Sequence, residues 1–380
     1  MTAGEAAPEP DRVAGALHPR ETPALYGQAA AEGAFLAALA GGRLHHAWLL
    51  TGPRGTGKAT LAWRIARHLI ALPPEGAGGL FGGAPPSAPA TLDIPPDHPV
   101  ARRMRALAEP RLHLVRRGPN TTGSGLSAVI RVEEVRALAD FLHLSAADGG
   151  RRAVIIDAAD EMHPAAANAL LKFLEEPPPG VTFLLVSHQP LSLLPTIRSR
   201  CRALRLSPVA PGDAALALAA QGVSPEAAKS VAVLAGGSIG EAVRLAALDG
   251  VEAYAALTGL LARAPGIDRA AAIAVAGRAQ GRGEGASEET AMIFGLTGLL
   301  LARLALAGAT GGAGPEAVPG EAALLARLSP DAAAARLWAD LAAGLGRRQQ
   351  RGLAVNLDPA GLLLDTLLRI DETAGRAVRR

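Results

Sequence analysis

The chain has 380 residues, a length typical of two or three domains. Hydrophobic residues make up 49% of it and aromatic residues only 3%, so its cores must consist of aliphatic side chains, which favours helix-rich packing. The net charge of +3, from 38 basic and 35 acidic residues, gives no sign of a nucleic-acid-binding surface over the whole molecule. The single cysteine, Cys201, excludes an intrachain disulfide and a zinc site made of four cysteines.

The first residues and the most apolar run both bear on the cellular compartment. Residues 1–24 are rich in Pro and Ala and lack a basic region followed by an apolar stretch, so we expect a flexible leader and no signal peptide. The run MIFGLTGLLLARLALAG is interrupted by Arg and Gly and falls short of the ~18–20 apolar residues of a transmembrane helix. We therefore expect a cytoplasmic protein with no membrane partner.

The next segment predicts a strand, a glycine-rich turn and a helix. LYGQAAAEGAFLAALAGGRL indicates an amphipathic helix that ends at Gly41 and Gly42. HAWLLTG is a short apolar strand, and KATLAWRIARHLIAL is a helix that follows the turn. Strand, glycine-rich turn and helix in this order form the context that a phosphate-binding loop needs.

The turn TGPRGTGKAT departs from the motif G-x-x-x-x-G-K-[ST] at one place. Gly52, Gly57 and Lys58 fit the motif, and Gly55 is a third loop glycine. Ala59 stands where a Ser or Thr hydroxyl would hold Mg²⁺. The backbone amides of such a loop and the helix N-terminus bind phosphate. We predict a nucleotide site that keeps its phosphate cradle but lacks a metal ligand; the alternative is a turn without a ligand.

The segments after this helix predict the rest of an α/β domain. Residues 73–110 are rich in Pro and Gly and are expected to form a surface insertion. Beyond them, the strand candidates RLHLVRR, AVIID and VTFLLVSH alternate with the helical segments RVEEVRALADFLHLSA and HPAAANALLKFLEEPPPG. Continuous apolar strands that alternate with helices indicate a parallel sheet covered on both faces. We assign residues 25–206 to this domain.

The remainder of the chain predicts helices only. Residues 207–278 are expected to form a small helical lid domain, and residues 279–289 a linker. Residues 290–380 are expected to form a second all-helical domain.

The segment AVIIDAADEM has the pattern of a Walker B strand, in which Asp157 would hold Mg²⁺ through water. Many ATPases place a Glu directly after this Asp to polarise the attacking water, and here Ala158 stands in that place. Asp160 and Glu161 follow at a predicted helix start, where capping explains them equally well. Together with Ala59, two catalytic positions have been lost, which favours a site that does not hydrolyse ATP.

A cluster of arginines follows the last predicted strand, in LLPTIRSRCRALRL. Arg198, Arg200, Arg202 and Arg205 fall within this short segment. Charge runs of this kind are usually solvated surfaces, so the spacing alone assigns them no function.

The segments GPRGTGK, IIDAADEM…NALLKFLEEPP, FLLVSHQP…LLPTIRSRC and GGSIGEAVRLA occur in this order. In order and spacing they resemble bacterial clamp-loader subunits of the AAA+ class. IIDAADEM and VSHQP are more similar to the delta-prime family of DNA polymerase III than to the ATP-hydrolysing gamma/tau family. The resemblance is strong over Leu44–Ile70 and Val129–Leu206 and fainter beyond them, and LLK-x-LEEPP combined with SRC is highly specific.

The resemblance implies roles for several residues. Ser199, Arg200 and Cys201 form the SRC motif, whose arginine reaches the ATP site of a neighbouring subunit, so Arg200 would be an arginine finger in trans. Ser187 takes the sensor-1 position. The sensor-2 arginine would fall at Gly240, which would be a third lost catalytic element, because Arg244 lies one turn later.

The resemblance also bears on ligands. Lys172, on the predicted helix NALLKFLEEPP, is a candidate contact to a DNA phosphate, and an ion pair between Lys172 and Glu175 is an equally good reading. Some delta-prime subunits carry a cysteine zinc module after the P-loop helix, but residues 73–110 contain no cysteine, so we expect no zinc. Weak ATP or ADP binding without hydrolysis is compatible with the retained Lys58 and loop glycines.

The function that the resemblance implies is that of a non-hydrolysing clamp-loader subunit, which is part of the DNA polymerase III holoenzyme, a nucleotidyltransferase. Its partners would be the gamma/tau and delta subunits and, through the complex, the sliding clamp and primed DNA. The helical domain 290–380 would be the collar that holds the subunits together. Three alternatives stay open: an active gamma/tau-like ATPase, a P-loop phosphotransferase of small molecules, and a scaffold without catalytic role.

Overall fold

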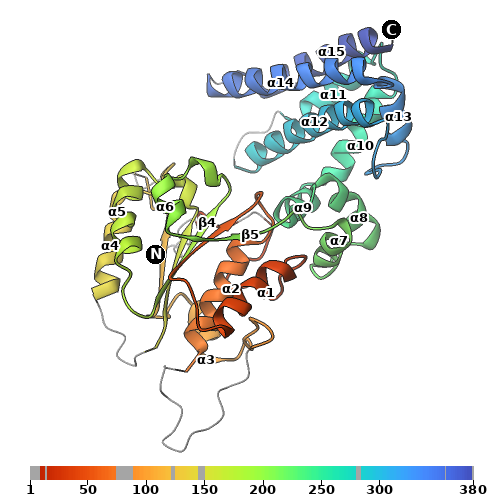
Figure 1. Cartoon of the computed structure of the whole chain (residues 1–380). Coiled ribbons are helices and arrows are strands. Elements are labelled where there is room, and N and C mark those ends of the chain that lie inside the picture. Colours follow the sequence, from red (N-terminus) through yellow and green to blue (C-terminus); the bar gives the residue numbers. More distant parts are fainter. Residues whose placement is uncertain are drawn as a thin grey trace, which may run out of the picture. The chain divides into compact units, whose positions relative to one another are not determined.

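The computed structural model describes residues 9–12, 15–73, 89–120, 125–143, 150–279, 284–355 and 357–378 (Figure 1). The chain divides into two compact units, Met1–Ala210 and Pro211–Arg380. The first unit contains a β-sheet between layers of helices, and the second contains helices over its described residues. This arrangement confirms the predicted fold class, an α/β domain followed by a helical region.

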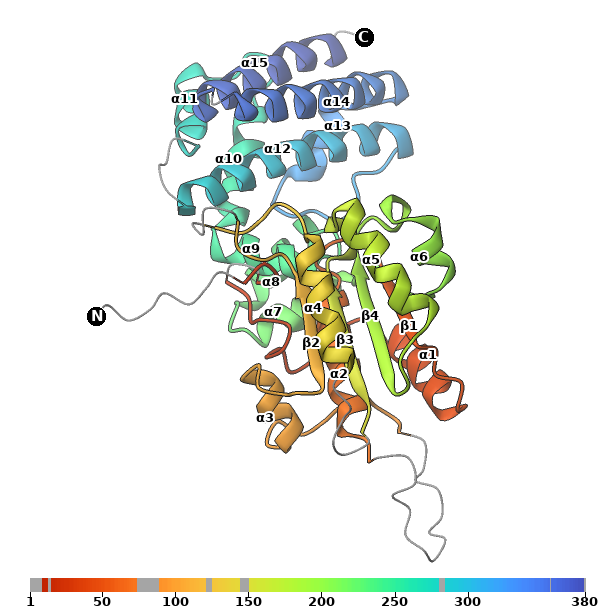
Figure 2. The same ribbon diagram turned by 90° about the vertical axis from the view of Figure 1, so that its left-hand side faces the viewer.

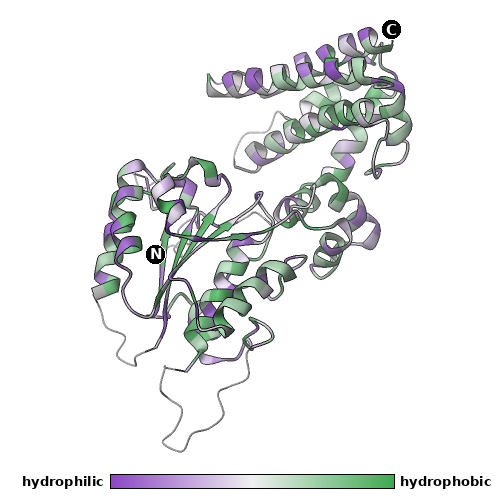
Figure 3. Ribbon diagram, in the orientation of Figure 1, coloured by the Kyte–Doolittle hydropathy of each residue, from purple (hydrophilic) through white to green (hydrophobic). Residues whose placement is uncertain are grey.

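The sheet of the first unit has five parallel strands in the order β2-β3-β4-β1-β5. Nearly every residue of the three central strands is buried, so both sheet faces are apolar, as the continuous apolar runs predict (Figure 3). The edge strand β5 was not predicted as a strand. The strands are β1 (Ala47–Thr51), β2 (Leu112–Arg116), β3 (Arg152–Asp157), β4 (Val181–Ser187) and β5 (Arg202–Arg205).

Helices cover both faces of the sheet, and adjacent residues of each strand point to opposite layers. Leu50 packs with the helices on one face, α1 (Ala29–Ala40), α2 (Lys58–Ala71) and α3 (Pro99–Arg105). Leu49 packs with those on the other face. Figure 2 shows α4 and α5 in front of the strands on this second face. Its helices are α4 (Val132–His143), α5 (Pro164–Glu175) and α6 (Pro195–Ser199).

The expected insertion, residues 73–110, is part of the first helical layer over its described residues. It contains α3, and the side chain of Leu92 is buried in the same core as α2. The Leu92 amide donates to Glu32 Oε1 at 3.0 Å, and Asp93 pairs with Arg64 of α2 at 2.9 Å. Residues 74–88, where the Pro and Gly content led us to expect a surface loop, lie outside the described residues.

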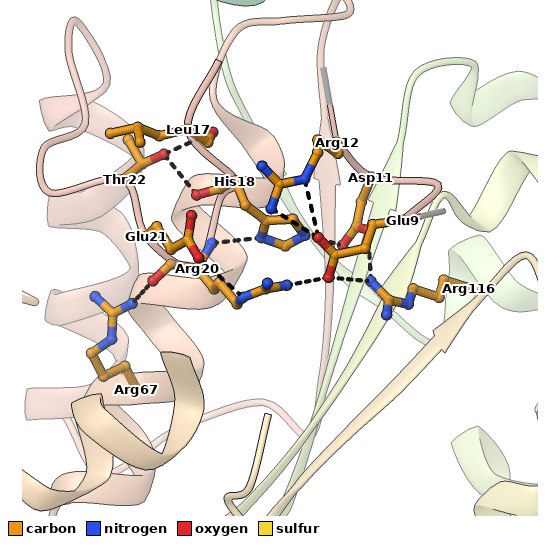
Figure 4. A network of polar contacts seen from close by, with 10 residues as sticks. All are labelled: Glu9, Asp11, Arg12, Leu17, His18, Arg20, Glu21, Thr22, Arg67 and Arg116. Atoms are coloured by element: carbon orange, nitrogen blue, oxygen red, sulfur yellow. Dashed lines mark hydrogen bonds and ion pairs between the residues drawn. The ribbon is translucent and has the colours of Figure 1, made fainter. Parts of the chain in front are cut away.

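The described part of the expected leader is packed against α2 and β2 (Figure 4). Asp11 accepts from Arg116 of β2 at 2.7 Å and pairs with His18 Nε2 at 3.1 Å. The fully buried His18 ring meets Trp63 of α2 edge-on, with the ring centroids 5.9 Å apart. The Glu9 carboxylate accepts a hydrogen bond from the Arg20 guanidinium. These residues thus contact α2 and β2 in the structure, and the flexible leader over 1–24 stays a prediction.

In the second unit, α7 (Pro211–Ala219), α8 (Pro225–Leu234) and α9 (Ile239–Ala247) pack on one another. The next helices, α10 (Gly250–Leu261) and α11 (Arg269–Gly277), pack mainly with the helices that follow them. These are α12 (Glu284–Thr310), α13 (Glu321–Leu328), α14 (Ala332–Ala354) and α15 (Pro359–Val378). α10 also packs on α8 and α9, and the linker over 279–289, of which 280–283 lie outside the described residues, stays a prediction.

A buried polar cluster fixes α10 within this C-terminal bundle. Tyr254 of α10 donates its hydroxyl to Glu321 Oε1 of α13 at 2.6 Å, and the Arg303 guanidinium of α12 donates to the same oxygen. Glu321 also accepts from the Ala317 amide at 2.7 Å. Since a buried carboxylate needs such partners, this cluster specifies how the three helices meet.

One described helix segment, Glu288–Thr310, is long and apolar enough to cross a membrane by length and composition alone. Half of its apolar window is buried inside the protein, as expected for the central helix of a bundle. The segment is therefore weak evidence for a membrane span.

The pairing of Asp11 predicts a pH-dependent stability. Burial alone would raise the pKa of the Asp11 carboxyl, but the hydrogen bond from His18 and the charge of Arg116 outweigh it and lower this pKa. A lowered carboxyl pKa contributes stability that is present above the unfolded pKa of ~3.9 and is lost as the pH falls through the folded value. We expect Asp11→Asn to lower the free energy of unfolding by about 1–2 kcal/mol at pH 7 and by less below pH ~4.

Urea unfolding between pH 3 and pH 7 measures this difference. Asp140→Asn on α4 is the matched control, since Asp140 is exposed, and should change stability by less than about 0.5 kcal/mol. An Asp11→Asn protein as stable as the wild type at pH 7 would contradict the assigned role.

Candidate functional site

The glycine-rich turn connects β1 to α2 as predicted, and two of its glycines are required by their surroundings. Gly52 has φ 145°, and a Cβ placed on it would lie 2.4 Å from the Leu206 carbonyl oxygen. Gly57 has φ 93° and directly precedes α2, and its Cβ would lie 2.6 Å from Leu25 Cδ1. Both positions combine a left-handed backbone with a close neighbour, so only glycine fits there without strain.

Gln28 ties this loop to the end of the α/β unit. Its side chain is 4% exposed, and its amide nitrogen donates to the carbonyl oxygens of Thr56 at 3.1 Å and Ser207 at 2.8 Å. Its amide oxygen accepts from the Ser207 backbone at 3.3 Å. The sequence analysis missed this residue, because nothing in the segment LYGQ alone shows which distant backbone groups it will contact.

Lys58 is buried at the start of α2 and faces its own loop. Its ammonium donates to the carbonyl oxygens of Gly52 at 2.8 Å and Pro53 at 2.5 Å. Burial lowers the pKa of Lys58 to about 8, although the nearby charges of Asp157 and Asp160 act in the opposite direction. The ammonium is thus charged at neutral pH but engaged by the loop, and a phosphate would have to compete with these two carbonyls.

Asp157 ends β3 and lies beside other carboxylates. Burial raises the pKa of Asp157 to about 7, and the charges of Asp11 and Glu161 add to the rise, with only Lys58 opposing them. The carboxylates near Asp157 thus include that of Asp11 from the N-terminal segment, an approach that no local pattern in the sequence predicts.

The two acidic residues after Asp157 have structural partners. Asp160 Oδ1 accepts from the His188 backbone amide at 2.9 Å. Glu161 pairs with Arg54 of the loop at 3.2 Å and with Arg117 at 2.9 Å. These contacts favour the structural interpretation of both residues over a role as the base that activates water.

Ser187 ends β4 at the same edge of the sheet. It is opposite Thr51 of β1 in the register, and its neighbour Val186 is opposite Asp157 of β3. The Ser187 hydroxyl is fully buried, and within the described part of the chain it has no hydrogen-bond partner. The structure therefore brings the ends of β1, β3 and β4 together at one site, with Lys58, Asp157 and Ser187 around it.

Arg200 follows α6 and its polar contacts are with its own chain. Its Nη2 lies 2.8 Å from Glu175 Oε1, and its Nη1 donates to the Thr196 carbonyl oxygen at 3.0 Å. The Ser199 hydroxyl donates to the same carbonyl at 3.0 Å. The Arg200 side chain is 35% exposed, so one side of the guanidinium faces solvent.

The other residues of interest have simpler surroundings. Burial raises the pKa of the Cys201 thiol to about 12, which fits a packing residue and not a nucleophile. Lys172 is exposed on α5, and Glu175, its suggested partner, pairs with Arg200. Arg244 is held by Glu241 of the same helix through two hydrogen bonds, of 2.9 and 2.6 Å.

Over the described ranges no group of three or more His, Cys, Asp or Glu side chains is placed to hold a metal ion.

The close approach at Gly52 predicts a loss of stability on substitution. We expect Gly52→Ala to lower the free energy of unfolding by about 2 kcal/mol or more, because the new Cβ would collide with the Leu206 carbonyl and the φ is unfavourable. Gly33→Ala in α1 is the control, since its Cβ would meet nothing within 4 Å. It should stabilise the helix by about 0.5–1 kcal/mol. Urea unfolding of both variants tests this, and equal stabilities would refute the interpretation.

Comparisons with known proteins agree with the motifs. A family model described as "DNA polymerase III, delta subunit" matches residues 93–210. The delta-prime subunit of Pseudomonas aeruginosa is 37% identical over 211 residues, which cover 54% of this chain and 57% of the relative. That of Bacillus subtilis is 34% identical over 207 residues, 54% of this chain and 55% of the relative. The chain thus spans little more than half the length of these relatives.

More distant similarities were also found. A gamma/tau subunit of Mycobacterium tuberculosis is 31% identical over 168 residues, which cover 43% of this chain and 24% of the relative. A solved structure of a DNA polymerase III gamma-subunit-related protein of Thermotoga maritima is 17% identical and covers 87% of this chain and 95% of that one. Its TM-score of 0.38 is too low to carry an argument. Over 42–54% of its length, this chain is thus similar to DNA polymerase III delta-prime subunits, at 33–38% identity.

Proposed function

We propose that this chain is a non-hydrolysing subunit of a bacterial clamp loader that supplies Arg200 to the ATP site of a neighbouring subunit. The observation that carries the proposal is the contrast between two sites. The chain's own nucleotide site lacks a metal-binding hydroxyl at Ala59 and a base at Ala158. Arg200, by contrast, is partly exposed at the end of a short helix.

The chemistry of phosphoryl transfer supports this division of labour. Hydrolysis requires a metal ion, an oriented water and positive charge on the transferring phosphoryl group. An arginine from a neighbouring subunit supplies only the last of these, and related fingers contribute about 10³–10⁵ in rate. Such a subunit needs a rigid frame for its arginine and no complete active site of its own.

The proposal includes the partners. Gamma/tau and delta subunits would be the neighbours, and the complex would act on the sliding clamp and primed DNA in the cytoplasm. Residues 207–278 would act as the lid, and the helical region 290–380 as the collar through which subunits assemble. The exposed Lys172 on α5 is the candidate contact to a DNA phosphate.

The isolated chain provides one test of the proposal. We expect no ATP turnover above background, and nucleotide binding that is weak and nearly independent of Mg²⁺, because Ala59 offers no hydroxyl to the metal and Ala158 no base. An ATPase assay and a nucleotide titration with and without Mg²⁺ measure this. A Mg²⁺-dependent turnover that Lys58→Ala abolishes would refute the proposal and support an active gamma/tau-like ATPase.

The reconstituted complex provides another test. Arg200→Ala should lower ATP turnover at the neighbouring site by a factor of about 10 or more, and clamp loading with it, because the transferring phosphoryl group there loses one stabilising positive charge. Arg205→Ala on the edge strand β5 is the control, since this arginine is also exposed and should leave the rate unchanged. Thermal unfolding of both variants checks that the chain remains folded. An unchanged rate for Arg200→Ala would remove the finger role.

A further inference from the structure

The ion pair between Arg200 and Glu175 joins two motifs that are 25 positions apart. Glu175 is the last residue of α5, in the segment LEEPP, and Arg200 directly follows α6. The two helices pack on each other, and the guanidinium Nη2 lies 2.8 Å from Glu175 Oε1. In this position the positive charge of Arg200 is neutralised by a carboxylate of its own chain.

We propose that Glu175 is a positioning residue whose carboxylate pairs with Arg200 until an anionic phosphate of the neighbouring subunit displaces it. We call this ion pair the latch. This inference rests on the proposed function of Arg200. A guanidinium has five N–H donors in a planar fork, and two of its nitrogens are used here on different partners. Nη1 is held by the uncharged Thr196 carbonyl, so only the contact at Nη2 is a charge pair.

The strength of the latch follows from its exposure. The Arg200 side chain is 35% exposed and that of Glu175 is 49% exposed, and ion pairs in such positions are weak because water screens them. A nucleotide phosphate carries more negative charge and presents several oxygens in a geometry that suits the guanidinium fork. Phosphate therefore displaces the carboxylate, and Glu175 sets how readily this exchange occurs.

Glu175 and its neighbour Glu176 differ in their contacts. Glu176 is the residue after the helix, is exposed as well, and donates its backbone amide to the Lys172 carbonyl. The two glutamates thus have the same charge and similar exposure, and only Glu175 contacts Arg200 in the described structure. This pair provides a matched comparison.

The test uses the complete reconstituted complex and steady-state ATP hydrolysis. Glu175→Gln keeps the size of the side chain but removes its charge, and should lower the KM for ATP about two- to five-fold with kcat unchanged, because the latch no longer competes with the phosphate. The effect should shrink in 0.5 M salt, which screens exposed charges. Glu175→Asp should keep a KM near that of the wild type, and Glu176→Gln should leave it unchanged.

A double variant distinguishes the latch from the finger role on which it rests. In an Arg200→Ala background, Glu175→Gln should have no effect on KM, because the latch has nothing to hold. An effect that persists in this background, or an unchanged KM in the single variant, overturns the latch. An Arg200→Ala complex that hydrolyses ATP at the wild-type rate overturns the finger role itself.

Discussion

The nucleotide site depends on one close approach between two backbones. Gly52 passes so near the Leu206 carbonyl that no side chain fits between them, and Gln28 fastens the loop to Ser207 a few ångströms further along. This contact fixes where the chain leaves β1 and hence where α2 begins. The position of Lys58 follows, because it is the first residue of that helix. Contacts within the protein thus hold the loop between β1 and α2.

The groups around this cradle are arranged for stability more than for catalysis. Lys58 is satisfied by loop carbonyls, Asp160 by a backbone amide and Glu161 by two arginines. An active site usually keeps such groups unpaired or strained so that substrate can complete them. Here Lys58, Asp160 and Glu161 have partners within the protein, whereas the Ser187 hydroxyl has none among the described residues and Asp157 lies among other carboxylates.

The parallel sheet and the loop were predictable because their signals are local. Apolar runs of strand length, a glycine-rich turn and the segments LEEPP and SRC each lie within a few residues of sequence. The ion pairs were not predictable, because Asp11 and Arg116 are 105 residues apart and Arg200 and Glu175 are on different helices. Glu175 is an example. Helical spacing suggested Lys172 as its partner, and in the folded chain it pairs with Arg200. Packing in the second unit was equally hidden, because Tyr254, Arg303 and Glu321, which meet in its core, are far apart in the sequence.

The N-terminal segment carries a consequence for the electrostatic potential at the phosphate site. Its Asp11 is close enough to Asp157 to raise the pKa of that carboxyl, while Arg116 compensates Asp11 from the neighbouring strand. The segment before the first helix therefore contributes to the charge around the end of β3, although it is distant from that strand in the sequence.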